Sequence, residues 1–365
     1  MAQPSPAPTV AIDGAVRAAM ARTAARGFAL AVIDNGEVRS VNTWGARNAA
    51  GDPLQPDTVM YAASITKAVF AYTVLQMADE GLIDLDRSIA DYLPRALPAY
   101  DQEEERYAPW HHLASDERWR RLTPRVLLTH RAGFANFFFL EPDGRLRFHF
   151  DPGTRFSYSG DAQILLQFVL ERGLGLDLGQ EMQRRVFDRL GMPNSSMMWR
   201  MDFRHNLADG WRLDGTLEPH DERSVPRAAG SLDTSIADLA RFAAAFVRGE
   251  GLSSARRAEA ARSQQPVLGV SQFPVLAPDP PRQRWPHLGV GLGVMTFEGP
   301  QGPGFFRGGH NDSTGNMWVC LERGRRCVLM MSNDVRAEAF FQEIATLILG
   351  ETGMPWGWVY PQFAR

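Results

Sequence analysis

Lys67 is the only lysine among the 39 basic residues of this 365-residue chain, and it stands three residues after Ser64. Arginine is effectively always protonated, whereas a lysine that is buried or set beside other cations can lose its proton and act as a base. A serine hydroxyl becomes a strong nucleophile only when such a base removes its proton. Holding a lysine neutral near pH 7 takes roughly 4 to 5 kcal/mol, which is typical of active sites. A coding bias toward arginine would also leave a single lysine, so the surrounding residues must decide between the two interpretations.

The spacing of apolar residues places Ser64 and Lys67 in the first turn of a predicted helix. Apolar side chains at 65, 68, 69, 72 and 75 share one face, and Gly81 would end the helix after about Glu80. Side chains at i and i+3 lie on the same side of a helix, so the amine can reach the hydroxyl. The backbone N–H of Ser64, near the helix N-terminus, is also available to stabilise an oxyanion.

A second acid–base group must protonate the leaving group, and Tyr158 is the candidate. It lies in the stretch PGTRFSYSG at 152–160, after a Pro-Gly turn and before a helix expected over 162–171. A phenol on such a loop can point into a cleft, although a tyrosine before a helix is more often a packing residue.

The remaining pattern predicts an α+β fold in which both ends of the chain build one sheet. Apolar runs flank Asn35-Gly36, which is a strong hairpin signal. We expect residues 1–63 and 226–365 to form a sheet lobe, residues 64–225 to form a mostly helical lobe, and the active site to lie between them. The expected elements are helices over 11–26, 180–190 and 337–349, strands over 28–34, 37–42, 288–297, 316–321 and 327–332, and an exposed loop over 264–286.

Composition excludes several other classes of function. A net charge of −3 gives no reason to expect nucleic acid as a partner, and no apolar run approaches the length of a membrane span. The sequence contains no Gly-x-Ser-x-Gly elbow, no His-Glu-x-x-His helix and no phosphate-binding Gly-Lys loop. The only adjacent histidines, His111 and His112, fit a solvated loop better than a metal site. We therefore expect no metal and no cofactor.

Cys320 and Cys327 stand opposite each other in an expected hairpin that turns at Arg323-Gly324. A cross-strand disulfide and two buried free thiols both fit this register. A disulfide would favour an oxidising compartment, and the Pro-rich start at residues 1–8 reads like the mature end left after a leader is removed. We expect a periplasmic or secreted protein, with a cytoplasmic one as the alternative.

Three ordered motifs resemble the serine β-lactamase and penicillin-binding-protein superfamily. They are Ser-x-x-Lys at 64–67, PGTRFSYSG at 152–160 and FRGGHNDSTGN at 306–316. LLTHRAGF at 127–134, VFDRLGMPNSSM at 186–197 and AAGSLDTSIADLARF at 228–242 are similar to segments of the branch that holds class C β-lactamases, D-aminopeptidases and family VIII esterases. The resemblance spans about residues 28 to 350 and implies a β-lactamase-like fold.

The resemblance implies that Ser64 is the acylated nucleophile, Lys67 its base and Tyr158 the proton shuttle. Two residues after this tyrosine the family usually carries an asparagine that contacts a substrate amide, but Gly160 stands here, with Asp161 and Gln163 as candidates to replace that contact. We therefore expect a small-molecule substrate, first a small carboxylic ester and then a D-amino-acid peptide or β-lactam. A non-catalytic ligand-binding relative is the alternative from another class, and the oligomeric state stays open.

The third motif can be placed in two ways. Arg307-Gly308-Gly309 matches Lys-Thr-Gly with Arg in place of Lys, and His310-Asn311-Asp312 matches His-x-Gly with Asp in place of Gly. We prefer the first, because arginine can replace a lysine that only supplies charge. Arg307 and Gly309 would then contact substrate, and His310 would lie where the strand donates an oxyanion N–H. The alternative for His310 is a turn histidine bonded to Asp312. Phe134 and Phe137 to Phe139 offer either an acyl pocket or core packing.

Overall fold

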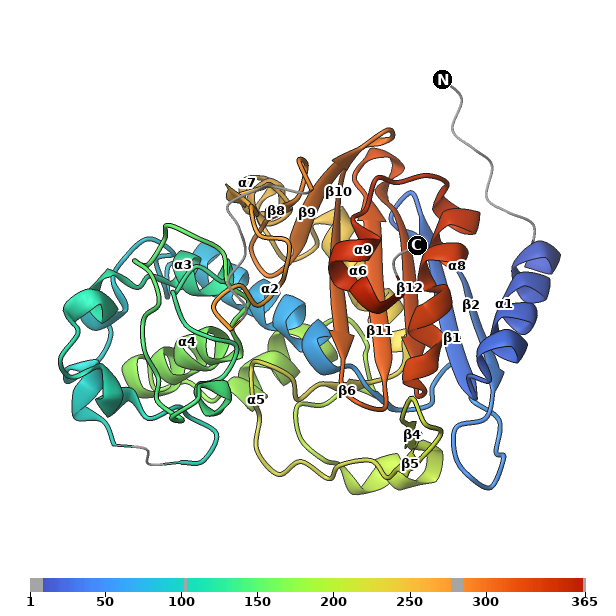
Figure 1. The fold of residues 1–365 in the computed structure, drawn as a ribbon, viewed down its shortest axis with the longest axis horizontal. Helices are drawn as coiled ribbons and strands as arrows, with labels where there is room; N and C mark the ends of the chain where they lie inside the picture. Colours follow the sequence, from blue (N-terminus) through green and yellow to red (C-terminus); the bar gives the residue numbers. More distant parts are fainter. Residues whose placement is uncertain (1–8, 102–103, 277–284, 364–365) are drawn as a thin grey trace.

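The computed structural model describes residues 9–101, 104–276 and 285–363. Within these residues, eight strands form one antiparallel sheet in the order β2-β1-β12-β11-β10-β9-β8-β7 (Figure 1). Strands from both ends of the chain lie side by side, because β1 pairs with β12 and places Ala29 opposite Met331. The expected sheet from both ends is confirmed. Its strands are β1 (Gly27–Asp34), β2 (Glu37–Gly45), β7 (Gln265–Pro266), β8 (Gly289–Val290), β9 (Met295–Gly299), β10 (Gly302–His310), β11 (Gly315–Leu321) and β12 (Arg326–Ser332).

The two faces of the sheet pack against different helices because side chains alternate along each strand. On β1, Phe28 and Leu30 belong to the core formed with α1 (Thr9–Thr23) and α8 (Phe341–Leu349). Ala29 and Ala31 point to the opposite face, into the core formed with α2 (Thr66–Asp79) and α6 (Ile236–Arg248). The sheet is therefore covered by helices on both faces.

A group of helices lies to one side of the sheet, at the left in Figure 1. Helix α2 is buried on all sides from Thr66 to Met77, as expected for a helix at the centre of a domain. The expected α+β architecture is confirmed; the boundaries of the two lobes, at 63/64 and 225/226, stay a prediction. The remaining elements are α3 (Pro124–Leu128), α4 (Gly160–Gly173), α5 (Leu178–Met182), α7 (Ser254–Ala260), α9 (Trp356–Val359), and the strand pairs β3 (Met60–Tyr61) with β6 (Asp233–Thr234) and β4 (Gly210–Trp211) with β5 (Leu217–Glu218).

The single strand expected over 288–297 is wrong, because the chain turns between β8 and β9. Gly293 has φ +85°, and a Cβ there would lie 2.2 Å from the Cβ of Ala71 on α2. The turn therefore packs closely on the helix that carries Lys67. The expected helix over 337–349 begins with a 3-10 turn at Val335–Phe340, and that over 180–190 contains a π turn at Gln183–Asp188. The loop expected over 264–286 contains β7, and its residues 277–284, like residues 1–8, lie outside the described residues.

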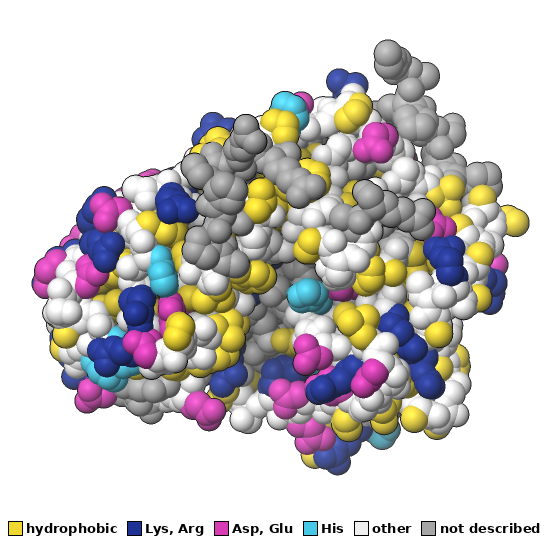
Figure 2. Space-filling model, in the orientation of Figure 1, with side chains coloured by type: hydrophobic (Ala, Val, Ile, Leu, Met, Phe, Trp, Pro, Cys, Tyr) yellow, Lys and Arg dark blue, Asp and Glu magenta, His cyan; other side chains and the backbone are white. Residues whose placement is uncertain are grey.

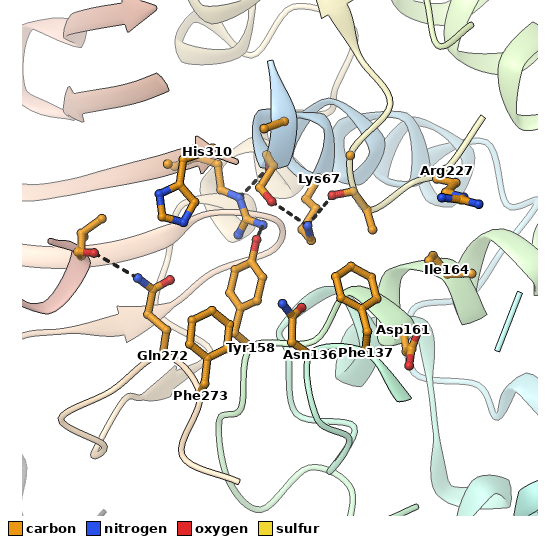
Figure 3. A pocket seen from close by; sticks show the side chains of 18 of the residues that line it. Lys67, Asn136, Phe137, Tyr158, Asp161, Ile164, Arg227, Gln272, Phe273 and His310 are labelled. Atoms are coloured by element: carbon orange, nitrogen blue, oxygen red, sulfur yellow. Dashed lines mark hydrogen bonds between the residues drawn. The ribbon is translucent and has the colours of Figure 1, made fainter. Parts of the chain in front are cut away.

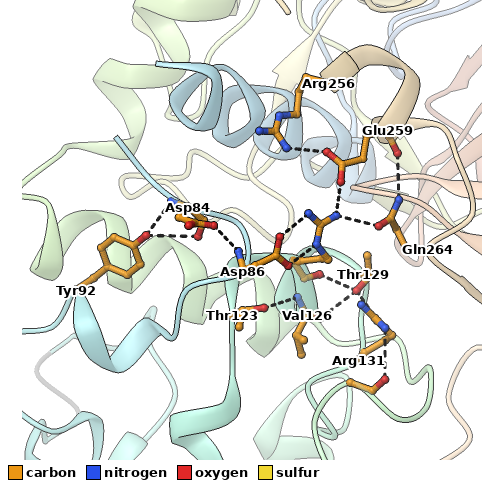
Figure 4. Close-up of polar contacts among 12 residues, drawn as sticks. Asp84, Asp86, Tyr92, Thr123, Val126, Thr129, Arg131, Arg256, Glu259 and Gln264 are labelled. Atoms are coloured by element: carbon orange, nitrogen blue, oxygen red, sulfur yellow. Dashed lines mark hydrogen bonds and ion pairs between the residues drawn. The ribbon is translucent and has the colours of Figure 1, made fainter. Parts of the chain in front are cut away.

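Arg125 on α3 joins the helical group to the sheet side of the molecule through hydrogen bonds to Asp86, Glu259 and Gln264, which are labelled in Figure 4. Its guanidinium donates to both carboxylate oxygens of Asp86, at 2.6 and 2.8 Å, and reaches Glu259 on α7 at 2.6 Å. It also donates to Gln264 at 2.9 Å, just before β7. This network ties segments that are far apart in the sequence.

The hairpin of β11 and β12 has the expected register, with Cys320 opposite Cys327. The two cysteines form a disulfide, so the alternative of two free thiols is wrong. The chain turns at Arg323–Arg325, where Gly324 has φ 75°.

Candidate active site

A cavity of about 840 Å³ holds nearly all of the expected site residues. Its lining combines residues of α2, β10, the loop at 136–139 and the segment at 270–273. Figure 2 shows a hollow near the middle of one face of the molecule, bordered by hydrophobic side chains. The predicted residues that line the cavity are Ser64, Lys67, Tyr158, Arg307, Gly309 and His310.

Ser64 lies in a 3-10 turn, Ala63–Ile65, immediately before α2. Ala63 has φ 47°, a left-handed backbone conformation that is unusual for a residue with a side chain. The Nζ of Lys67, one turn further, lies 2.9 Å from the Oγ of Ser64 and also contacts the carbonyl oxygen of Ala229. The predicted contact between the amine and the hydroxyl is therefore present.

Burial changes the pKa of both acid–base groups. It lowers the pKa of Lys67 from 10.5 to about 8, against the opposing effect of the Tyr158 phenol and with help from Arg307. Burial alone would raise the pKa of Tyr158, but the charges of Arg307 and Lys67 and hydrogen bonds to Ser64 and Lys67 lower it to about 8. A lysine and a tyrosine that titrate in the same range can exchange a proton at little cost.

The guanidinium of Arg307 is buried and directed at protein groups. It donates to the hydroxyl of Tyr158 at 2.9 Å and to the carbonyl of Ser64 at 3.1 Å, and lies 3.4 Å from Nε2 of His130. Burial lowers its pKa, and the Tyr158 phenol partly offsets this. Arg307 thus positions Tyr158, and its predicted contact with substrate stays a prediction.

Gly309 brings β10 against the nucleophile. A Cβ at this position would lie 2.5 Å from the carbonyl oxygen of Ala62 and 2.8 Å from the backbone nitrogen of Ser64. Real Cβ atoms do not approach this closely, so a glycine is required here. The strand that follows Arg307 therefore lies beside the N–H that we assign to the oxyanion site.

His130 was missed as a functional residue by the sequence analysis. Its ring stacks on that of Tyr158, with centroids 4.5 Å apart and an angle of 15° between the planes. Burial, followed by the charges of Arg307 and Lys67, holds the pKa of His130 well below 6.5, so the ring is neutral. LLTHRAGF contains this residue, but the motif alone does not reveal that its ring supports Tyr158.

Gly160 begins α4 behind the wall of the cavity rather than in it. A Cβ on Gly160 would lie 2.3 Å from the ring of Phe137, which occupies that space. Of the two candidates to replace a side chain at 160, Asp161 lines the cavity, and burial raises its pKa to about 8 although a hydrogen bond from the backbone of Phe138 opposes this. Gln163 donates to the carbonyl of Leu127 and is not part of the lining.

His310 lies at the end of β10 with its Nδ1 3.2 Å from a carboxylate oxygen of Glu338. This hydrogen bond raises the pKa of His310, and burial raises the pKa of Glu338. The partner is Glu338 rather than the Asp312 considered from the sequence. Glu338 has no sequence signal, because it lies 28 residues away in a separate turn.

Of the four phenylalanines considered for an acyl pocket or for core packing, three line the cavity and one belongs to the core. Phe137, Phe138 and Phe139 line the cavity. Phe134 is fully buried, and the centroid of its ring lies 4.8 Å from that of Phe148. The first three residues can therefore contact an apolar group of a substrate.

No cluster of three histidine, cysteine, aspartate or glutamate side chains with metal-binding geometry is present in the part of the chain that the structure describes. Among its helices, none has both the length and the apolar character that crossing a membrane requires.

Comparisons with known proteins identify the family of this chain. A family model described as Beta-lactamase matches residues 12–351. The chain is 25% identical to a penicillin-binding protein 4 from Amycolatopsis lactamdurans over 353 residues, which cover 89% of this chain and 85% of that protein. It is 30% identical to a lovastatin esterase from Penicillium rubens over 187 residues, but this match spans only 43% of this chain and 44% of the esterase.

The solved structures agree on the fold. The penicillin-binding protein homologue from Pyrococcus abyssi superposes with a TM-score of 0.74 at 19% identity, covering 97% of this chain and 80% of the other. At this identity the likeness shows a shared fold and leaves substrate open. Because the family model covers nearly the whole chain, this protein belongs to the beta-lactamase family.

Proposed function

We propose that this protein hydrolyses small carboxylic esters through an acyl-enzyme formed on Ser64. The observation that carries the proposal is the buried amine of Lys67, 2.9 Å from the Ser64 hydroxyl and with a pKa lowered to about 8. At that pKa about one lysine in ten is neutral at pH 7, and neutralisation costs about 1.4 kcal/mol instead of the roughly 4 to 5 kcal/mol for a free lysine.

In the proposed acylation step, neutral Lys67 takes the proton of Ser64 as Oγ attacks the ester carbonyl. The backbone N–H of Ser64 and that of the strand at His310 stabilise the oxyanion. The proton then passes through the hydroxyl of Tyr158 to the departing alcohol oxygen. In deacylation the same groups accept a proton from water as it attacks the acyl carbonyl, and Ser64 regains its proton.

Small esters come first as substrates because Phe137 to Phe139 form an apolar wall of the cavity and the asparagine usual at position 160 is replaced by glycine. The partial match to a lovastatin esterase supports this choice. The longer match to a penicillin-binding protein supports the alternative, which is hydrolysis of D-amino-acid peptides or β-lactams.

The test is the hydrolysis of p-nitrophenyl butyrate by the wild type beside Ser64→Ala. We expect turnover by the wild type and only the uncatalysed rate with the variant. Equal rates for the two proteins would exclude the proposed esterase activity. Hydrolysis of a chromogenic β-lactam and of a D-alanyl peptide would then be measured with the wild type and Ser64→Ala. Acylation without turnover of any of these would favour a non-catalytic ligand-binding protein.

A periplasmic or secreted location is also proposed. The disulfide between Cys320 and Cys327 supports it, because disulfides persist in oxidising compartments. Fractionation of the native host, followed by detection of the protein, would test the location.

A further inference from the structure

The side-chain amide of Asn136 is fixed in one orientation by the start of α4. The backbone N–H of Gly160 donates to the carbonyl oxygen of Asn136 at 2.8 Å and to its Oδ1 at 3.0 Å, and the N–H of Asp161 donates to the same carbonyl at 3.0 Å. Only an oxygen can accept from these N–H groups, so the side-chain oxygen must face Gly160. The amide nitrogen, Nδ2, must then face the other way.

The opposite direction is the cavity. Asn136 is one of its lining residues, and Figure 3 shows the amide nitrogen directed into the space between Tyr158 and Phe137. Among the described residues, no hydrogen bond from Nδ2 to another protein group is present. The site therefore holds an oriented N–H donor whose partner is not part of the protein.

The other polar side chains at this end of α4 each make a hydrogen bond with the protein. Asp161 accepts from the backbone of Phe138 at 2.6 Å, and Gln163 donates to the carbonyl of Leu127 at 2.7 Å. Position 160 has no room for a polar side chain, because its Cβ would overlap the ring of Phe137. Asn136 is thus the residue of this group that is placed to recognise a polar atom of a substrate.

We propose that Nδ2 of Asn136 donates a hydrogen bond to an oxygen of the substrate's acyl group. The inference rests on the proposed hydrolase and names its substrate class: esters whose acyl group carries an amide or ketone oxygen close to the scissile carbonyl. The oxygen belongs to the acyl group because Asn136 directly precedes Phe137 to Phe139, the apolar wall to which that group is assigned. A purely alkyl acyl group would leave this donor unsatisfied.

The experiment compares two p-nitrophenyl esters, of N-acetylglycine and of pentanoic acid, which share a leaving group and a chain length. For the wild type and for Asn136→Asp, the kcat/KM of the N-acetylglycine ester is divided by the kcat/KM of the pentanoate ester. Ser64→Ala serves as the blank for uncatalysed hydrolysis. The aspartate keeps an oxygen to accept from Gly160 and loses the N–H donor. We expect the ratio to fall by about tenfold, the usual effect of one lost hydrogen bond. Turnover of the pentanoate ester reports folding and catalysis in the same sample.

Gln272→Glu is the matched control, because it adds a carboxylate at the side of the cavity across Tyr158 from Asn136 (Figure 3). This variant should keep the wild-type ratio. An unchanged ratio in Asn136→Asp, or an equal fall in Gln272→Glu, would overturn the proposal.

If the wild type hydrolyses neither ester, the proposed esterase fails and recognition is measured as binding. The p-nitroanilides of the same two acids are then titrated by calorimetry. A preference of the wild type for the N-acetylglycine compound that is lost in Asn136→Asp supports the inference, and equal affinities of the wild type for both compounds overturn it.

Discussion

In the proposed mechanism, Lys67 and Tyr158 act as one proton-transfer unit rather than as two independent residues. Both groups are buried, both have a pKa of about 8, and the positive charge of Arg307 lowers the pKa of each. In such a coupled pair the first proton lost belongs to the pair. The neutral ring of His130, stacked on Tyr158, keeps the phenol in place without adding a third charge.

Lys67→Arg should reduce kcat/KM for p-nitrophenyl butyrate by about 10²- to 10⁴-fold, the usual contribution of a general base. The charge is kept in this variant, but an arginine cannot become neutral near pH 7. Steady-state kinetics beside wild type and Ser64→Ala provide the measurement. An arginine variant with near wild-type activity would rule out the neutral-amine mechanism.

The pH profile should show a rising limb with an apparent pKa near 8. The reactive state needs a Lys67–Tyr158 pair that has lost one proton. The value of kcat/KM therefore falls as the pH drops below this pKa. Arg307→Gln removes a charge that lowers the pKa of both groups, and should move the limb to higher pH. A limb that is unchanged in Arg307→Gln but disappears in His310→Asn would assign the titration to the imidazole instead.

Among the elements, strand β10 sets the distance between the nucleophile and the oxyanion site. Gly309→Ala should lower the free energy of unfolding by about 1 to 3 kcal/mol, because its Cβ would overlap Ala62 and Ser64. It should also reduce kcat/KM by at least about tenfold, since a misplaced catalytic group is costly. Thermal unfolding and kinetics measure the two effects.

Gly308→Ala on the same strand is the control for this prediction. A Cβ at Gly308 would lie 3.2 Å from the flexible end of Met317, and its other contacts, with Asn316 at 3.8 Å and Val359 at 3.9 Å, have ordinary van der Waals distances. Equal losses in the two alanine variants would mean that the strand tolerates no side chain in general, and that the approach to Ser64 is not the cause.

The motifs and the hairpin signals predicted most of the features that depend on residues close together in the sequence. They predicted the contact between Ser64 and Lys67, the cysteine register and the sheet built from both ends. Asn136, His130 and Glu338 were missed because each acts through a residue distant in the sequence, and their side chains carry no local pattern. The break at Gly293 was missed because the run from 288 to 297 alternates glycine with apolar residues, which also fits a strand, and the sequence does not show the close packing of this turn on α2.

For the whole molecule, Arg125 is one of the residues that join the helical group to the sheet side, as is Arg131, which donates to Gln265 at 2.8 Å. Arg125→Met should lower the free energy of unfolding by about 2 kcal/mol, because Glu259 loses a charged partner while four-fifths buried. Urea denaturation followed by tryptophan fluorescence measures this change.

Asp86→Asn serves as the matched control, since the Asp86 side chain is 65% exposed and an exposed ion pair contributes about 1 kcal/mol or less. If Asp86→Asn were as destabilising as Arg125→Met, the stabilisation would come from the ion pair of Arg125 with Asp86 and not from its ion pair with Glu259 on α7.

The pairing of β1 with β12 also governs when the protein can fold. Met331 is synthesised 302 residues (331 − 29) after its partner Ala29. A growing chain cannot complete the central sheet until β12 has been made, and contacts of such long sequence separation form slowly. During synthesis the apolar residues of β1 therefore have β2 beside them but lack β12, and such an unpaired strand edge favours aggregation of the nascent chain.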